Sequence, residues 1–159
     1  MIFTIGYQGL KLPELEEVRE ALDATIVDVR SKPRSRNPAY NGSALARVFG
    51  PRYTWQGKTL GGMPPYVMPD GLAWLTDRSR HETLILMCME RAPGECHRHH
   101  RIALSLPEPV YHVFHDVVVE ARELARSMAS EDDYDWTPLE AYAAPRISAT
   151  MPTRSSPET

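Results

Sequence analysis

The sequence predicts an α/β domain in which a mostly parallel central sheet lies between two layers of helices. Short apolar, β-branched runs alternate with segments of helical periodicity along residues 1–128, the order that is typical of parallel sheets. Two of these runs, residues 24–29 and 83–88, show little polar alternation, as expected of strands that are covered on both faces. With 159 residues, 42% of them hydrophobic, the chain can bury one core but is short for two.

The first part of the chain is predicted to be a βαβ unit. Residues 1–5 form an apolar run that ends at the glycine turn of residues 6–9. Residues 10–22 place leucine and valine at helical spacing, and a second strand follows at residues 24–29. Residues 31–42 contain two prolines and a glycine, so they are predicted to form a loop at the carboxyl end of that strand, where functional residues are common.

The remainder of the domain alternates less regularly. The predicted elements are, in order, a helix at 43–49, a brief strand at 52–55, an irregular stretch at 60–69, a helix at 71–79, a strand at 83–88, a helix at 95–106, a strand at 110–119 and a helix at 120–128. The strand at 83–88 has the strongest pattern and is expected at the centre of the sheet. Cys96 is then expected at the start of a helix.

Residues 129–159 are predicted to be an acidic, proline-containing tail outside the domain. They include Glu131-Asp-Asp133 and four prolines, and they show no sustained period, which is typical of disordered segments. The alternative is that Tyr134, Trp136 and Tyr142 dock on the domain or on a partner.

Composition and charge limit the classes of partner. The net charge is −3, but residues 1–126 carry sixteen Lys and Arg against fifteen Asp and Glu, so a local anion site is compatible with the total while a long nucleic-acid-binding stripe is not evident. No apolar run is long enough to cross a bilayer, and residues 1–6 lack the features of a secretory signal. We therefore expect a cytoplasmic protein with no membrane partner, whose two cysteines are thiols.

Sheet topology predicts that three distant segments form one site. In open parallel sheets, ligands bind beyond the carboxyl ends of the strands. Residues 6–9, 28–36 and 88–98 all follow predicted strands. We expect them to meet at one edge of the sheet, with residues 60–62 beside them.

Residues 88–98 contain the densest set of reactive side chains and allow three interpretations. In the first, the helix start at Cys96, His97 and Arg98 binds an anion. In the second, Cys96 is a thiolate nucleophile, and His97 or Glu90 transfers protons. In the third, zinc is bound by ligands drawn from Cys88, Cys96, His97, His99 and His100. Because neither cysteine belongs to a CxxC pair, no cofactor is predicted and zinc remains an alternative. Cys88 lies on the predicted buried strand at 83–88 and is expected to be a core residue.

The other predicted site residues are acidic, basic, aromatic or glycine. Asp28 and Arg30 lie two apart on a strand and therefore share a face, either in a structural network with groups such as Glu90 and Arg98 or orienting a substrate. Glu90 and Asp28 are predicted to transfer protons. The predicted ligand-binding residues are Gly6, Tyr7, Gly9, Arg30, Ser35, Arg36, Tyr40, Gly61, Gly62 and Arg98.

Four motifs occur together: Thr4-Ile-Gly-Tyr-Gln-Gly9, Val27-Asp-Val-Arg30 with Pro33 and Ser35-Arg36, Leu60-Gly-Gly62, and Cys88-Met-Glu90 followed by Cys96-His-Arg98. In this order they resemble the domain of unknown function 488 family, over roughly residues 1–116. The resemblance implies a Rossmann-like α/β domain with these segments as its signature. The family's name assigns no activity.

These observations lead us to expect a protein that binds an anionic ligand, which is phosphorylated, nucleotide-like or nucleic acid. Hydrolase or transferase chemistry is favoured over redox chemistry because no dinucleotide-binding fingerprint is present. One alternative is a non-catalytic module that binds protein or nucleic acid through the same arginines. Another is a zinc-binding protein that uses the cysteine and histidine cluster.

Overall fold

A seven-stranded mixed sheet forms the centre of the protein in the computed structural model, which describes residues 1–114, 116–130 and 137–143. The strand order is β3-β2-β4-β1-β5-β6-β7. The strands are β1 (Ile2–Gly6), β2 (Ala24–Asp28), β3 (Tyr53–Trp55), β4 (Thr83–Cys88), β5 (Val110–Phe114), β6 (Val117–Glu120) and β7 (Thr137–Pro138). The first five are parallel to one another, and β6 runs antiparallel to its neighbours β5 and β7. The predicted α/β class and mostly parallel sheet are confirmed.

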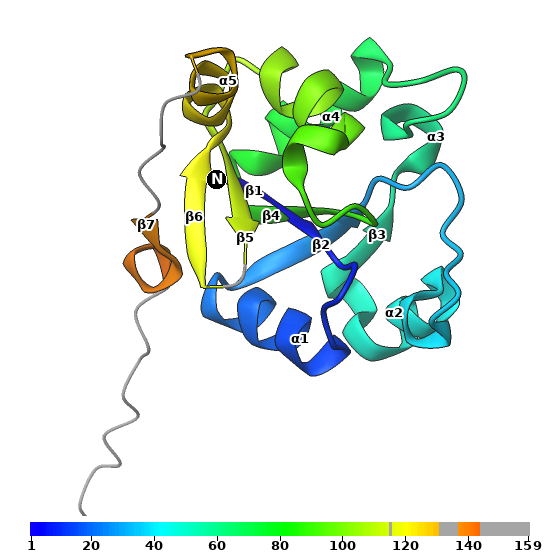
Figure 1. The fold of residues 1–159 in the computed structure, drawn as a ribbon. Helices are drawn as coiled ribbons and strands as arrows, with labels where there is room; N and C mark the ends of the chain where they lie inside the picture. Colours follow the sequence, from blue (N-terminus) through cyan, green and yellow to red (C-terminus); the bar gives the residue numbers. More distant parts are fainter. Residues whose placement is uncertain (115, 131–136, 144–159) are drawn as a thin grey trace, which may run out of the picture.

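Helices cover both faces of this sheet (Figure 1). One face carries α1 (Leu12–Ala21) and α2 (Gly42–Phe49), whose Leu15 and Leu45 pack with Phe3 and Ile5 of β1. The other face carries α3 (Gly57–Leu60), α4 (Pro69–Ser79) and α5 (Ala121–Ser130), with Leu75 packed in the second core. Alternate residues of each inner strand therefore point into different cores.

The strand at 83–88 is central, as predicted, because β4 lies between β2 and β1. The predicted single strand at 110–119 is wrong: β5 and β6 form a hairpin in which Phe114 pairs with Val117. His115, which lies between the two strands in the sequence, is outside the described residues. The pairing of β6 turns the chain back toward α5.

The predicted regular helix at 95–106 is also wrong. This segment consists of a 3₁₀ turn at Pro93–Glu95, a π-helical turn at Arg98–Ile102 and a second 3₁₀ turn at Ala103–Ser105. Two successive side chains, Arg98 and His99, are buried here, and π turns of this kind are frequent at functional sites. The predicted anion site required the N-terminus of a long helix at Cys96, and the structure has no such helix there.

Part of the predicted tail is ordered. Residues Thr137–Pro138 form β7 on β6, and a 3₁₀ turn at Leu139–Tyr142 follows. The Tyr142 ring lies 5.6 Å from that of Phe3 and 5.2 Å from that of Tyr111, so the docking alternative is confirmed for Tyr142. Tyr134, Trp136 and the rest of the tail, residues 131–136 and 144–159, lie outside the described residues.

Within the described ranges, no helix has both the length and the apolar character required to cross a membrane.

Candidate functional site

The carboxyl ends of β1 and β4 lie side by side, and the chain leaves them toward opposite faces. After β1 it continues to α1, whereas after β4 it enters the turns on the α4 side. Pairing extends past the strands, because the Tyr7 N–H donates to the Cys88 carbonyl at 3.0 Å. A Cβ atom on Gly6 would lie 1.8 Å from the Glu90 carbonyl oxygen, so only glycine fits there. Gly6 thus allows the loop of residues 89–91 to cross over β1.

Three side chains of types that can bind a metal ion converge on the α4 side of this edge. The Sγ atoms of Cys88 and Cys96 and a ring nitrogen of His97 all lie within 4.8 Å of one another. The Nδ1 atom of His97 is 3.9 Å from the Cys88 Sγ and 3.7 Å from the Cys96 Sγ. Cys88 is delivered by the end of β4, and Cys96 and His97 by the turn that follows Pro93–Glu95. The two cysteines are eight residues apart in the sequence, and a single compact loop brings their thiols together.

The backbone fixes which nitrogen of the His97 ring carries hydrogen. Its Nε2 atom lies 3.1 Å from the Val29 carbonyl oxygen and 2.9 Å from the Leu60 carbonyl oxygen. Since carbonyl oxygens only accept hydrogen bonds, Nε2 must be the protonated nitrogen. In the neutral ring the lone pair of Nδ1 then points at the two sulfur atoms.

Glu90 lies beside the thiols. Its Oε2 atom is 3.1 Å from the Cys88 Sγ, and the side chain is half-buried. Glu90 follows the central strand β4, as predicted. Its carboxylate belongs to the same site as the thiols of Cys88 and Cys96.

The two thiols have opposite acidities. The pKa of Cys96 is lowered to about 5, first by the hydrogen bond from the Cys88 thiol and further by His97 and Arg98, although burial opposes the shift. The pKa of Cys88 is raised by the same hydrogen bond, by burial and by the nearby charges of Cys96 and Glu90. Burial lowers the pKa of His97, but interactions with Cys96 and with the Leu60 and Val29 carbonyls outweigh it, so the pKa is raised from its usual value. Cys96 is thus the thiol that ionises first.

Arg98 has a different environment from the one that an anion site requires. Its side chain is 1% exposed. Its guanidinium donates to the carbonyls of Glu90 at 2.6 Å and Arg91 at 3.1 Å, and to the Thr4 hydroxyl at 3.2 Å. An anion would have to displace these partners. In this arrangement Arg98 holds the loop that presents Glu90.

His99 and His100 are not part of the thiol cluster. His99 is buried, and its Nδ1 is 2.8 Å from Nε2 of His112, whose Nδ1 is 2.7 Å from the Thr4 hydroxyl oxygen. His100 is exposed and lies against the Gly94 carbonyl. Of the five alternative zinc ligands, the structure gathers Cys88, Cys96 and His97.

Asp28 and Arg30 form a buried pair on the opposite face of the sheet. The Asp28 carboxylate accepts from Arg30 Nε at 2.9 Å and from Nη2 at 2.6 Å, and it also accepts from the Tyr53 hydroxyl at 2.7 Å. Arg30 donates to the Tyr7 hydroxyl at 3.2 Å, and the Tyr7 ring stacks on Tyr40 at 4.3 Å. The single predicted site is therefore divided by the sheet into two clusters.

The other predicted residues are distributed around these clusters. Ser35 and Arg36 lie on the loop after β2, where Ser35 is half-buried and Arg36 is exposed. Gly61 adjoins Ser31, and a Cβ on Gly62 would lie 2.8 Å from Nδ1 of His97. Gly9 has a φ of +79° in the turn after β1. Gly62 is thus the one predicted glycine that contacts a side chain of the thiol cluster.

Sequence reasoning missed two residues at this edge. Tyr53 supplies the third polar partner of Asp28, and Trp55 donates its indole N–H to the Arg30 carbonyl at 2.8 Å. Both belong to the brief strand predicted at 52–55. An aromatic side chain at the carboxyl end of a parallel strand was the available signal.

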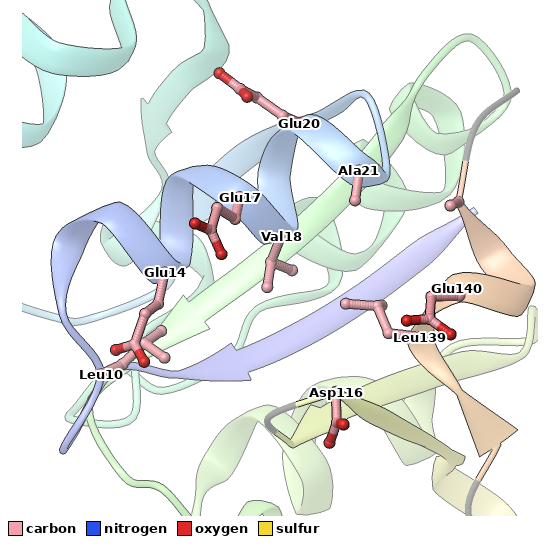
Figure 2. A pocket seen from close by; sticks show the side chains of 10 residues that line it. Leu10, Glu14, Glu17, Val18, Glu20, Ala21, Asp116, Leu139 and Glu140 are labelled. Atoms are coloured by element: carbon pink, nitrogen blue, oxygen red, sulfur yellow. The ribbon is translucent and has the colours of Figure 1, made fainter. Parts of the chain in front are cut away.

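A large hollow of about 770 Å³ lies elsewhere, between α1 and the segment that follows β7 (Figure 2). Apolar side chains such as Val18 and Leu139 lie among its lining residues. Its carboxylates are those of Glu14, Glu17, Glu20, Asp116 and Glu140. Such a lining disfavours the anionic ligands that the sequence led us to expect.

Comparison of the chain with protein-family models, with curated proteins and with solved structures found no match.

Proposed function

We propose that the protein binds a zinc ion through Cys88 Sγ, Cys96 Sγ and His97 Nδ1. The observation that supports this most strongly is the spacing of the donors. Zinc–ligand bonds of about 2.0–2.3 Å at tetrahedral angles separate neighbouring ligand atoms by about 3.6–3.8 Å. The two distances from His97 Nδ1 to sulfur, 3.9 and 3.7 Å, lie close to this range.

The chemistry of the donors supports the same proposal. Two thiolates and an imidazole suit zinc better than they suit magnesium or calcium, which prefer oxygen ligands. Metal-binding histidines usually donate their second ring N–H to a carboxylate or backbone carbonyl, and His97 Nε2 faces two such carbonyls. The lowered pKa of Cys96, caused first by the Cys88 hydrogen bond, favours the thiolate form that binds metal.

A metal site accounts for the burial better than a free nucleophile does. Reactive cysteines usually lie in partially exposed, electropositive environments. Here Cys96 is 2% exposed and Cys88 is 4% exposed, so neither sulfur atom is open to direct contact with a substrate, whereas Glu90 and His97 beside them are only half-buried. A zinc ion requires only that its ligands converge.

Three protein ligands leave a fourth coordination position, which is the arrangement of hydrolytic zinc sites. Glu90, 3.1 Å from the Cys88 sulfur and half-buried, is suitably placed to act as a general base toward a water at that position. We therefore favour hydrolase chemistry within the expected hydrolase or transferase class.

The resemblance of the motifs to the domain of unknown function 488 family belongs to the same proposal. Under it, the fold is Rossmann-like, and its Cys-x-Glu and Cys-His-Arg motifs serve the metal centre. In that case Cys88, Cys96 and His97 are ligands, Glu90 is the base, and Arg98 positions the loop by holding the Glu90 and Arg91 carbonyls.

Metal content tests the proposal. Protein purified without chelator is expected to contain one zinc per chain by elemental analysis, and cobalt substitution is expected to give the absorption of a tetrahedral, thiolate-ligated ion. Cys96→Ser and His97→Gln should each lower zinc affinity at least tenfold. His81→Gln, at an exposed histidine outside the cluster, should not.

Glu90→Gln should keep the zinc affinity of the wild type, because Glu90 is proposed as a base and not as a ligand. Glu95→Gln, at an exposed glutamate on the same loop, is the matched control and should also keep that affinity. Two results would overturn the proposal: substoichiometric metal combined with no zinc uptake in titration, or wild-type affinity in both Cys96→Ser and His97→Gln.

A further inference from the structure

A second hollow, of about 510 Å³, opens at the carboxyl ends of β2 and β3. It is lined by residues that follow β2 (Lys32), end β3 (Trp55), belong to α3 (Lys58) and come from the loop before α4 (Met63 and Met68). This is the edge of a parallel sheet at which ligands bind. The hollow lies outside both clusters described above.

The ring of Trp55 is a fixed platform in this hollow. It is 38% exposed, and its indole N–H donates to the Arg30 carbonyl at 2.8 Å. A Cβ on Gly57 would lie 2.4 Å from the indole nitrogen and 1.9 Å from the Arg30 carbonyl oxygen. Glycine at this position is therefore required for the ring to lie where it does, with its polar atom satisfied inside the protein.

The opposite wall is also held in place. The Met63 N–H donates to the Ser31 hydroxyl at 2.9 Å, and the Met68 N–H donates to the Thr59 carbonyl at 2.8 Å. Between them, the Arg101 guanidinium lies over the Tyr66 ring at 4.4 Å. The methionine and proline side chains of this wall therefore face the hollow from an ordered loop.

The hollow is positively charged. Lys32 and Lys58 are both exposed and are two of the three lysines of the chain. No acidic residue lines the hollow among the residues that the structure describes. The nearest buried carboxylate on β2, that of Asp28, is neutralised by Arg30. A ligand here meets an exposed indole, thioethers and two ammonium groups.

We propose that this hollow binds a nucleotide, either free or as a unit of a single strand. The base stacks on Trp55, because every nucleobase has a π face that aromatic side chains accept. The phosphate lies between the ammonium groups of Lys32 and Lys58. The proposal does not depend on zinc. The hollow is separated from His97 by the end of α3 and the glycines that follow it.

Binding measurements on the full chain test the proposal. The probes are AMP, adenosine, inorganic phosphate and a fluorescently labelled octamer of deoxyadenylate, with affinities measured by calorimetry and by anisotropy. AMP is expected to bind at least about tenfold more tightly than adenosine or phosphate, and its binding should weaken with salt. Equal affinity for AMP and the octamer indicates a free nucleotide as ligand, and tighter binding of the octamer indicates a strand.

The variants separate stacking from charge. Trp55→Ala should weaken binding at least about tenfold, whereas Trp55→Phe, which keeps a ring, should retain most of it. The double variant Lys32→Ala with Lys58→Ala should weaken AMP binding by a similar factor, and Lys11→Ala, at the third lysine, should not. Failure of AMP and the octamer to bind, or wild-type affinity in Trp55→Ala, would overturn the proposal.

Discussion

The Nε2 atom of His97 lies 2.9 Å from the carbonyl oxygen of Leu60, the last residue of α3. This contact assigns the ring proton to Nε2 and turns Nδ1 toward the two thiols. A short helix from another part of the chain thus sets the orientation of the imidazole that we propose as a zinc ligand. Gly62 completes the restraint, since the ring occupies the space where a Cβ would be.

The first prediction concerns Gly62→Ala. Its Cβ would lie 2.8 Å from the His97 ring, so the ring must move away from the position in which Nδ1 meets the sulfur atoms. We expect zinc affinity to fall by about 10–100-fold, as for other changes that disturb the support of a metal ligand. Competition with a chromophoric chelator measures this.

The matched control is Gly94→Ala. Its Cβ would contact the flexible end of the Met128 side chain at 3.0 Å, which is free to adjust. Its zinc affinity should equal that of the wild type. Equal affinities for Gly62→Ala and the wild type would contradict the role given to α3.

The second prediction concerns the buried ion pair. Asp28 is fully buried, and Arg30→Met leaves its carboxylate without a counter-charge. The free energy of unfolding should fall by about 3–5 kcal/mol, which is typical when one partner of a buried pair is removed. Urea unfolding of the full chain measures the change.

Arg52→Met provides the comparison, because the Arg52–Asp23 pair has a similar distance of 2.7 Å but both side chains are exposed. Its loss should stay within about 0–1 kcal/mol. Adding Asp28→Asn to Arg30→Met should restore part of the loss. Similar losses for Arg30→Met and Arg52→Met would refute the buried-pair argument.

The Asp28–Arg30 pair also illustrates what could be predicted from the sequence. The two-residue period of a strand predicts that the side chains share a face, and their direct contact confirms it. Their partners are Tyr7, which follows β1, and Tyr53 on β3. Local pattern contains no information on which neighbours a strand acquires, so those partners could not be named.

The division of the predicted site has the same origin. Asp28 at the end of β2 and Cys88 at the end of β4 both lie at the carboxyl edge, as the alternation of strands and helices predicts. They point into different cores because Asp28 is in register with Met87 and not with Cys88, and successive residues of a strand face opposite sides. Which residue of β4 pairs with Asp28 is a matter of register, which a single sequence does not specify.

The third prediction concerns pH. The pKa of His112 is lowered to about 2, first by burial and then by the charges of His99 and Arg98. An unfolded histidine has a pKa of about 6.5, so between these values the unfolded chain binds more protons. The free energy of unfolding should therefore fall as the pH decreases below about 6.5, by at most about 1.4 kcal/mol per pH unit from this residue.

His112→Gln isolates this contribution. Its amide can accept from Thr4 and donate to His99, which are the two partners of the imidazole, but it does not titrate. Between pH 6.5 and 5 the variant should lose less stability than the wild type, while His81→Gln should follow the wild type. Parallel curves for His112→Gln and the wild type would exclude His112 as a source of acid sensitivity.

The fourth prediction concerns the segment beyond α5. Tyr142 packs against the rings of Phe3 and Tyr111, and the Leu139 N–H donates to the Asp116 carbonyl at 2.7 Å. Tyr142→Ala removes the two ring pairs and part of the apolar cover of β1, so the free energy of unfolding should fall by about 1–3 kcal/mol. Tyr142→Phe keeps the ring and should change it by less than about 0.5 kcal/mol.

A chain that ends at Ser130 should be less stable than one that ends at Ala143 by at least the loss seen in Tyr142→Ala, because it also lacks the pairing of β7 with β6. Equal stability of the two chains would place the end of the folded domain at α5, where the sequence pattern alone had placed it.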